Sequence, residues 1–126
     1  MMSDFPAGSL VTLEEFFEGN SDLGSIGCNL SEHPGIWVFY KTLKRIKARP
    51  DVQDVLVHIT ESAADGQTDW PFSDHVYIIS SAGIDELSEQ LTPLQPDPVT
   101  EGLMEKAPDN FPPLREGMRV ICIWWD

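Results

Sequence analysis

The chain has 126 residues, of which 41% are hydrophobic and 23% charged, so it is long enough to bury one hydrophobic core. Its formal net charge is −13 and its sequence pI is near 4.3, which predicts a surface that repels nucleic-acid phosphates. No run of about 18 apolar residues is present, so we expect no membrane-spanning segment. We therefore predict one folded domain over residues 1–126 that binds neither nucleic acid nor membrane.

The compartment is indicated by the N-terminus and the cysteines. The first ten residues contain no Lys or Arg, whereas a secretory signal begins with a positive region. Cys28 and Cys122 are too few for a disulfide framework in a chain of this length. These features predict reduced thiols and a cytoplasmic location.

The first predicted element is a short helix from Thr12 to Glu18. Thr12 and Glu15 have the spacing of a capping box, in which each side chain bonds to the backbone amide of the other residue. A strand through 10–17 is the alternative, although the paired glutamates break its alternation of polar and apolar residues.

Two longer helices follow, over about 34–48 and 83–92. In the first, Pro34 suits a helix start and the apolar residues repeat every three or four positions. This stripe is Ile36, Phe39, Tyr40, Leu43 and Ile46. In the second, Ser81 is a possible cap and the apolar stripe is Ile84, Leu87 and Leu91.

Four strands are predicted, at 25–30, 52–60, 74–80 and 118–125, from apolar residues that recur at alternate positions in the first three and run almost without interruption in the last. The element order is then that of a ferredoxin-like βαββαβ two-layer sandwich of the α+β class. The N-terminal helix is an addition to it, and a proline-rich excursion over 92–117 precedes the last strand. We expect an antiparallel sheet in the order four, one, three, two, with both longer helices on one face.

The last predicted strand, 118–125, contains the run Val120 to Trp125, which is apolar on both faces, so both faces need a cover. The helices cover one face, and the excursion over 92–117 or a second copy of the chain covers the other. Trp124 and Trp125 point to opposite faces, and we expect their truncation to have unequal effects.

Five of the eight cations of the chain lie near the end of the helix at 34–48, at Lys41, Lys44, Arg45, Lys47 and Arg49. Cations at this position stabilise a helix by complementing its negative C-terminal end. A local anion-binding patch is the alternative interpretation.

Catalytic and metal-binding patterns are weak. His33, His58 and His75 lack the spacing of zinc ligands, and we predict that they bind no metal and that the protein has no cofactor. Cys28 could act as a thiol nucleophile with a histidine and Asp74, but its position on the apolar side of a strand favours a buried structural thiol.

An aromatic surface is the most plausible place for a partner. If one face of the sheet is uncovered, aromatic side chains from several strands gather there, and exposed aromatic patches mark binding sites. The predicted surface consists of His58, Trp70, Phe72, Asp74, Tyr77, Trp124 and Trp125.

Several short segments resemble a family of small acidic bacterial proteins. They are the stretch 15–20 (EFFEGN), the stretch 24–30 (GSIGCNL) with His33-Pro34-Gly35, the stretch 70–74 (WPFSD) and the terminal Trp124-Trp125-Asp126. The resemblance covers nearly the whole chain and implies a bacterial single-domain protein. The family has no assigned activity, so the resemblance implies no catalytic residue.

Two functional hypotheses remain. The first is a non-enzymatic protein-binding or regulatory module, which binds a partner or itself through the aromatic surface; an immunity-type inhibitor of a basic toxin is one version. The second is a small enzyme or small-molecule-binding protein with a site around Asp74, His75, His58 and Cys28. Convergence of these four side chains in one cleft would favour the second hypothesis.

Overall fold

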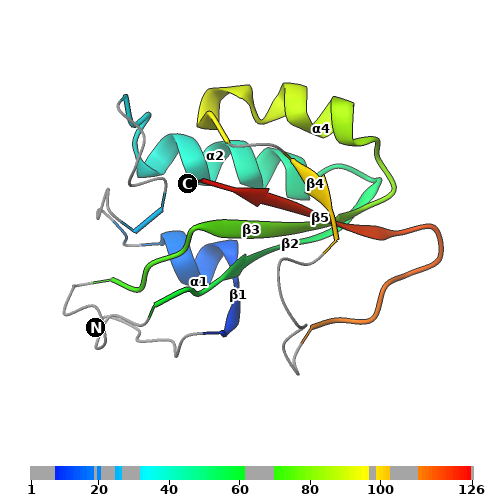
Figure 1. The fold of residues 1–126 in the computed structure, drawn as a ribbon, viewed down its shortest axis with the longest axis horizontal. Coiled ribbons are helices and arrows are strands. Elements are labelled where there is room, and N and C mark those ends of the chain that lie inside the picture. Colours follow the sequence, from blue (N-terminus) through cyan, green and yellow to red (C-terminus); the bar gives the residue numbers. More distant parts are fainter. Residues whose placement is uncertain are drawn as a thin grey trace.

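A computed structural model describes residues 8–18, 20, 25–26, 32–61, 70–96, 99–102 and 111–125. Five strands form one sheet in the order β1-β2-β3-β5-β4, and every neighbouring pair is antiparallel (Figure 1). The strands are β1 Leu10–Thr12, β2 Val52–His58, β3 His75–Ser80, β4 Thr100–Glu101 and β5 Arg119–Trp124, and the helices are α1 Leu13–Phe17, α2 Ile36–Lys47, α4 Ile84–Gln90 and the 3-10 turn η1 Thr92–Leu94. The predicted α+β class is confirmed.

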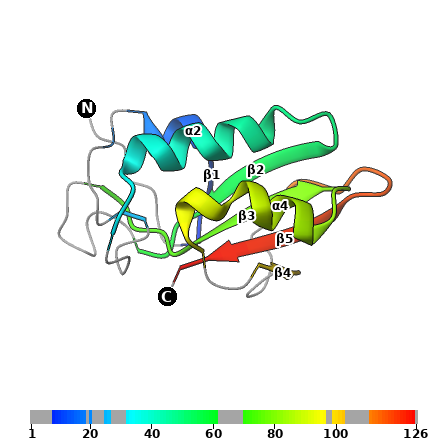
Figure 2. The same cartoon turned by 90° about the horizontal axis from the view of Figure 1, so that it is seen from above.

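The helices pack on one face of the sheet and enclose the main core (Figure 2). The inward stripe of α2 is Ile36, Phe39, Leu43 and Ile46, and all four side chains are buried. They meet the strand residues that point to this face, which are Val55, Val57, Val76, Ile78, Ile121 and Ile123. The period of two in the strands and the period of 3.6 in the helix therefore produce matching apolar surfaces.

The predicted strand order is wrong. β3 lies between β2 and β5, whereas the ferredoxin-like order places the last strand beside the first. The physical reason is that the run 120–125, most of which forms β5, is apolar on both faces and belongs beside a buried strand. That strand is β3, whose six residues are all buried. The predicted pairing of strands two and three is confirmed, with His58 opposite His75.

The first predicted strand, 25–30, lies mostly outside the described residues. Of its described part, Ile26 is buried and forms one isolated parallel bridge with Ser73. The edge of the sheet beside β2 is instead formed by β1, where Leu10 pairs with His58. The stretch 10–17 therefore contains both a strand, Leu10–Thr12, and a helix, Leu13–Phe17.

The boundary between β1 and α1 is set by the predicted capping box. The hydroxyl of Thr12 accepts a hydrogen bond from the amide of Glu15 at 3.1 Å, and the Glu15 carboxylate accepts one from the amide of Thr12 at 2.9 Å. The Ser81 cap was not found, because α4 begins after Gly83 without a side-chain cap. Within the proline-rich segment, Thr100–Glu101 forms strand β4, which was not predicted.

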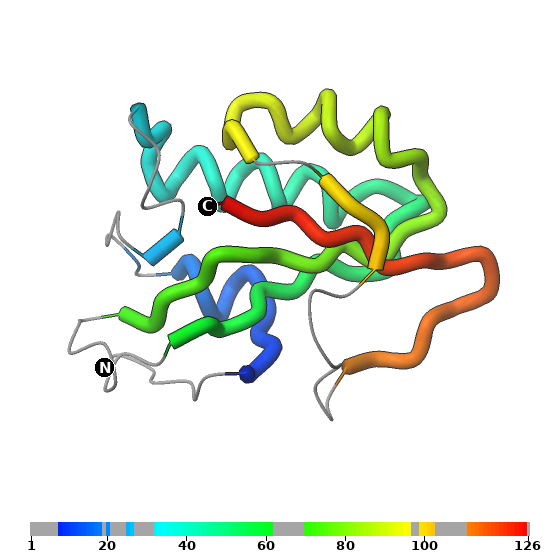
Figure 3. Tube along the Cα trace, in the orientation of Figure 1, coloured from blue at the N-terminus to red at the C-terminus, as the bar shows by residue number. Residues whose placement is uncertain are grey.

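Part of the proline-rich segment covers the sheet face opposite the helices, as the first of the two predicted alternatives required. Phe111 packs edge-on against Tyr77, with 6.0 Å between ring centroids. The side chain of Gln53 holds the segment to β2: its amide donates to the carbonyl of Pro113 at 3.0 Å, and its oxygen accepts from the amide of Arg115 at 2.8 Å. Figure 3 shows this segment leading into β5 away from α2 and α4.

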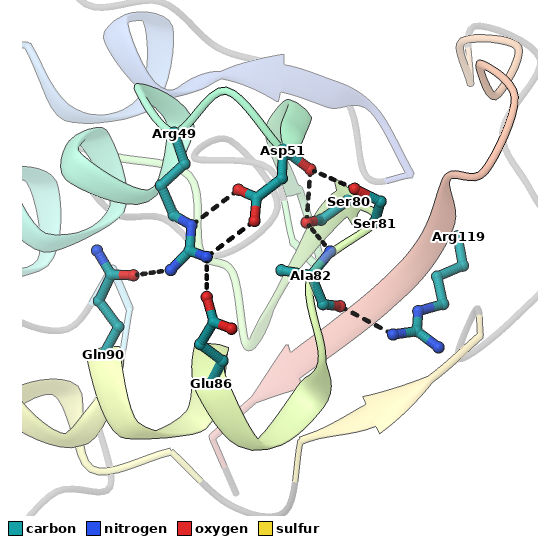
Figure 4. A network of polar contacts seen from close by, with 8 residues as sticks. All are labelled: Arg49, Asp51, Ser80, Ser81, Ala82, Glu86, Gln90 and Arg119. Atoms are coloured by element: carbon teal, nitrogen blue, oxygen red, sulfur yellow. Dashed lines mark hydrogen bonds and ion pairs between the residues drawn. The ribbon is translucent and has the colours of Figure 1, made fainter.

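A polar cluster fixes the end of α2 against α4 (Figure 4). Arg49 donates to both carboxylate oxygens of Asp51 at 2.9 Å and to Gln90 at 2.9 Å, and it forms an ion pair with Glu86. The carbonyl of Asp51 accepts a hydrogen bond from the Ser80 hydroxyl at 2.8 Å. The cluster therefore joins both helices to the end of β3.

The structure assigns the two terminal tryptophans to opposite faces. Trp125 is 4% exposed, contacts Phe39 and donates from its indole nitrogen to the carbonyl of Leu94 at 2.8 Å. Trp124 is only partly buried and packs on the Tyr77 side.

We predict that Trp125→Ala lowers the free energy of unfolding by about 3–5 kcal/mol, because it removes a buried indole and orphans a carbonyl. Trp124→Ala should have a smaller effect. Urea unfolding of the two variants checks this, and equal losses would contradict the assignment.

Candidate functional site

Three of the four side chains in the enzyme hypothesis meet at the end of β2 and β3. His75 Nδ1 lies 2.6 Å from Asp74 Oδ1, and His75 Nε2 lies 2.6 Å from His58 Nδ1. The Thr60 hydroxyl donates to Asp74 Oδ1 at 2.9 Å. Asp74, His75 and His58 therefore form one chain of hydrogen bonds, which we call the Asp-His-His chain. The fourth residue, Cys28, lies outside the described residues.

The chemistry of the groups determines where the protons lie when both rings are neutral. A carboxylate only accepts hydrogen bonds, so His75 Nδ1 donates to Asp74. His75 Nε2 then accepts a hydrogen bond from the Nδ1–H group of His58. The hydrogen bond from His75 lowers the pKa of Asp74 below its ordinary value, with a further contribution from Thr60, although burial acts in the opposite direction.

The two histidine rings of the cluster are buried, whereas the Asp74 side chain is 39% exposed. His58 and His75 are each 3% exposed, and Tyr77, two residues further along β3, is 1% exposed. Ser73 continues the polar network, because its hydroxyl lies 2.7 Å from the carbonyl of His58 and 2.8 Å from that of His75. His58, His75 and Ser73 are thus buried polar groups with hydrogen-bond partners inside the protein, as the interior of a protein requires.

The thiol on this face is Cys122, which lies opposite Tyr77 in the β3–β5 register. Burial raises the pKa of Cys122 to about 12, and the charge of Asp74 adds to the shift. A thiol with this pKa stays protonated near neutral pH and is a poor nucleophile. Among the described residues, no three His, Cys, Asp or Glu side chains are grouped to hold a metal ion.

The predicted aromatic surface is divided between the two faces of the sheet. His58, Tyr77 and Trp124 lie on the face that Phe111 covers, and Asp74 is at its end. Trp70 and Trp125 belong to the helix side, where the Trp70 indole donates to the carbonyl of Phe16 at 2.7 Å. Phe72 is partly buried and bridges to Glu61. Most of these seven side chains are therefore occupied by contacts within the fold.

A surface that was not predicted from the sequence lies on the outward side of α2. Trp37 is 68% exposed, which is unusual for a tryptophan. It meets Tyr40 edge-on, with 6.2 Å between ring centroids, and Tyr40 stacks on Phe17 at 5.4 Å. A shallow hollow of about 280 Å³ lies on this side, and we call it the Trp37 surface. Its lining residues are Trp37, Tyr40, Lys41, Lys44, Arg45 and Ala48.

The cations near the end of α2 divide into two groups. Lys47 lies 3.6 Å from Glu14 and 3.8 Å from Asp54, and Arg49 is bonded as described above. Lys41, Lys44 and Arg45 form no ion pair with a described carboxylate. Lys44 instead lies over the ring of Tyr40, 5.1 Å from its centroid. Lys44 and Arg45 are in the last turn, where the helix dipole favours cations, but Lys41 is not.

The sequence contained a signal for the Trp37 surface. Its residues recur at intervals of three and four along the helix, as the apolar core stripe does, but on a different side of the helix. The predicted core stripe included Tyr40, and Trp37 was assigned to no surface. An aromatic residue outside the core stripe, followed by cations at the same period, is the pattern that identifies such a surface.

Fold and surface together define a small acidic α+β domain with a covered sheet and an aromatic, basic patch on one helix. The chain belongs to a known family: residues 2–123 match the family described as "Uncharacterized protein YfbO family". It is 33% identical over 118 residues to "Uncharacterized protein YfbO" of Escherichia coli strain K12, an alignment that covers 93% of this chain and 82% of the relative. The resemblance to an uncharacterised bacterial family is thus confirmed. No solved structure matches the chain.

In the part of the chain that the structure describes, no helix has the length and apolar character needed to cross a bilayer.

The Asp-His-His chain predicts a specific pH dependence. Because the pKa of Asp74 is lower in the folded than in the unfolded chain, the ionised carboxylate stabilises the fold above the ordinary value of 3.8, and this contribution is lost as the pH falls below it. We predict that Asp74→Asn destabilises the fold at neutral pH. The difference from the parent chain should shrink as the pH falls from about 5 to about 3.

Urea unfolding across this pH range is the measurement, and Glu116→Gln, at an exposed position, is the control. A difference between the parent and Asp74→Asn that does not change with pH would contradict the assignment. Carbon-13 chemical shifts of the Asp74 carboxyl group would report its titration directly.

Proposed function

We propose that the protein is a non-enzymatic protein-binding module and that it binds its partner through the Trp37 surface. The observation that carries the proposal is the exposed indole of Trp37 beside Tyr40, where both line a hollow along the outward side of α2. Tryptophan, tyrosine and arginine are the residues most enriched at binding hot spots. Tyr40 is held in place by its stack on Phe17, so the surface is ordered before a partner arrives.

The placement of the polar groups supports a module over an enzyme. An active site needs its acid, base and nucleophile beside a space that a substrate can enter. His58 and His75 are buried, and the pKa of the neighbouring Cys122 is raised. Their role in this proposal is to complete the polar part of the core.

An immunity-type inhibitor needs an acidic surface at the place where it binds a basic toxin. The net charge of −13 supports such a surface elsewhere on the molecule, but the cations of the Trp37 surface would repel a basic partner there. Our proposal therefore concerns a partner of another kind at this helix.

We place the function in the cytoplasm, which the free, buried thiol of Cys122 supports.

Site-specific photocrosslinking tests the surface in living cells. A photoreactive phenylalanine derivative at position 37 keeps an aromatic ring there, and the same derivative at position 114 is a matched control, because Leu114 is another exposed apolar residue at 44% exposure. We expect one protein to be crosslinked from position 37 and not from position 114. Equal products from both positions, or none from position 37, would contradict the proposal.

The partner identified in this way must also bind the purified chain. We predict that Trp37→Ala weakens its affinity by at least about 2 kcal/mol, the loss typical of a hot-spot residue. The same variant should change the free energy of unfolding by less than about 0.5 kcal/mol, because the side chain is mostly in water. Calorimetry of binding and urea unfolding measure the two quantities.

A further inference from the structure

We propose that the Trp37 surface recognises a short acidic protein segment that places one aromatic or large aliphatic side chain in the hollow. This inference rests on the proposed function and adds the chemical class of the partner. It is drawn from three properties of the surface: the unpaired cations, the size of the hollow and the charge of the rest of the chain.

The cations of the Trp37 surface are available to a partner. Lys41, Lys44 and Arg45 have no described carboxylate as an ion-pair partner, although the chain contains 21 acidic residues. The neighbouring Lys47 and Arg49 do have such partners. Acidic side chains therefore pair with Lys47 and Arg49 and leave the three cations of the Trp37 surface without an ion-pair partner among the described carboxylates.

The hollow fits a side chain. Its volume of about 280 Å³ lies below the range of roughly 300–1,000 Å³ that is usual for pockets of small molecules. Two of its lining residues, Trp37 and Tyr40, are aromatic, and Ala48 closes the stripe with a small side chain. Such walls favour an apolar anchor, while the three cations around it pair with carboxylates of the same segment.

The charge of the whole chain favours a short segment over a polyanion. A nucleic acid or an anionic membrane presents charge over a wide area, and the net charge of −13 repels it beyond the patch. Surface charges are screened over about 10 Å at ordinary salt, so a short peptide interacts mainly with the cations beside it. The same repulsion disfavours a second copy of the chain as the occupant.

Selection from a random peptide library tests the inference without knowledge of the natural partner. The parent chain is the bait, and sequences that also bind Trp37→Ala are removed. We expect the remaining sequences to be enriched in Asp and Glu and to contain an aromatic residue or Leu. Enrichment of neutral or basic sequences, or no sequences that depend on Trp37, would overturn the inference.

The selected peptide is then synthesised and titrated into labelled protein, with the four tryptophan indole signals observed by NMR. We expect the Trp37 signal to shift most. Lys41→Glu should weaken binding at least about tenfold, whereas Arg115→Glu should change it less than about twofold. Both substitutions take the net charge from −13 to −15, since each replaces +1 by −1, so they differ only in position.

Alternative partners are measured with the same variants. Vesicles of phosphatidylglycerol and phosphatidylcholine and a single-stranded thymidine oligonucleotide serve as probes, and sedimentation reports self-association. Binding of either probe, or a dimer, that is lost in both Trp37→Ala and Lys41→Glu would overturn the inference of a peptide partner. If position 37 crosslinks one protein but the selected peptides are not acidic, the partner class is wrong and the proposed function stands. If position 37 crosslinks nothing, the proposed function itself fails.

Discussion

Burial of strand β3 on both faces is the constraint on which the rest of the structure depends. All six residues from His75 to Ser80 are buried, and the strand hydrogen-bonds to β2 on one side and to β5 on the other. A strand in this position needs two covers, since neither face can remain in water. The helices supply one cover. The segment around Phe111 contributes to the other, which explains why Gln53 holds that segment to β2.

The same constraint explains the polar groups inside the fold. His75 begins a strand without a wet face, so its ring nitrogens must find partners within the protein. Asp74 and His58 are those partners, and the Ser73 hydroxyl bonds to the backbone at the same place. At the other end of β3, the Ser80 hydroxyl bonds to the carbonyl of Asp51, next to the Arg49 cluster. Both ends of the central strand are thus fixed by polar contacts, and its middle by apolar ones.

Helix α2 has two different stripes with different roles. Phe39 and Leu43 point into the core and hold the helix on the sheet. Trp37 and Lys41 line the hollow on the outward side, where Trp37 is 68% exposed although it meets Tyr40 edge-on. The binding role that we propose accounts for an exposed indole among cations. The core stripe positions the outer one, because it fixes the rotation of the helix about its axis.

The sequence by itself determined the main helices and the long strands, and the tertiary structure decided their arrangement and the short edge strands β1 and β4. The capping box at Thr12, the core stripe of α2 and the two faces of β2 were predictable, because a helix or strand repeats its apolar residues with its own period. The strand order was not predictable in this way, since alternation shows which face of a strand is buried but not which strand lies beside it. Convergence of Asp74, His75 and His58 was only a possibility until the register of β2 and β3 placed the two histidines opposite each other. The core stripe indicates that Trp37 lies off the sheet, but only the tertiary structure shows that Tyr40 beside it packs on Phe17 of α1 while Trp37 itself stays exposed.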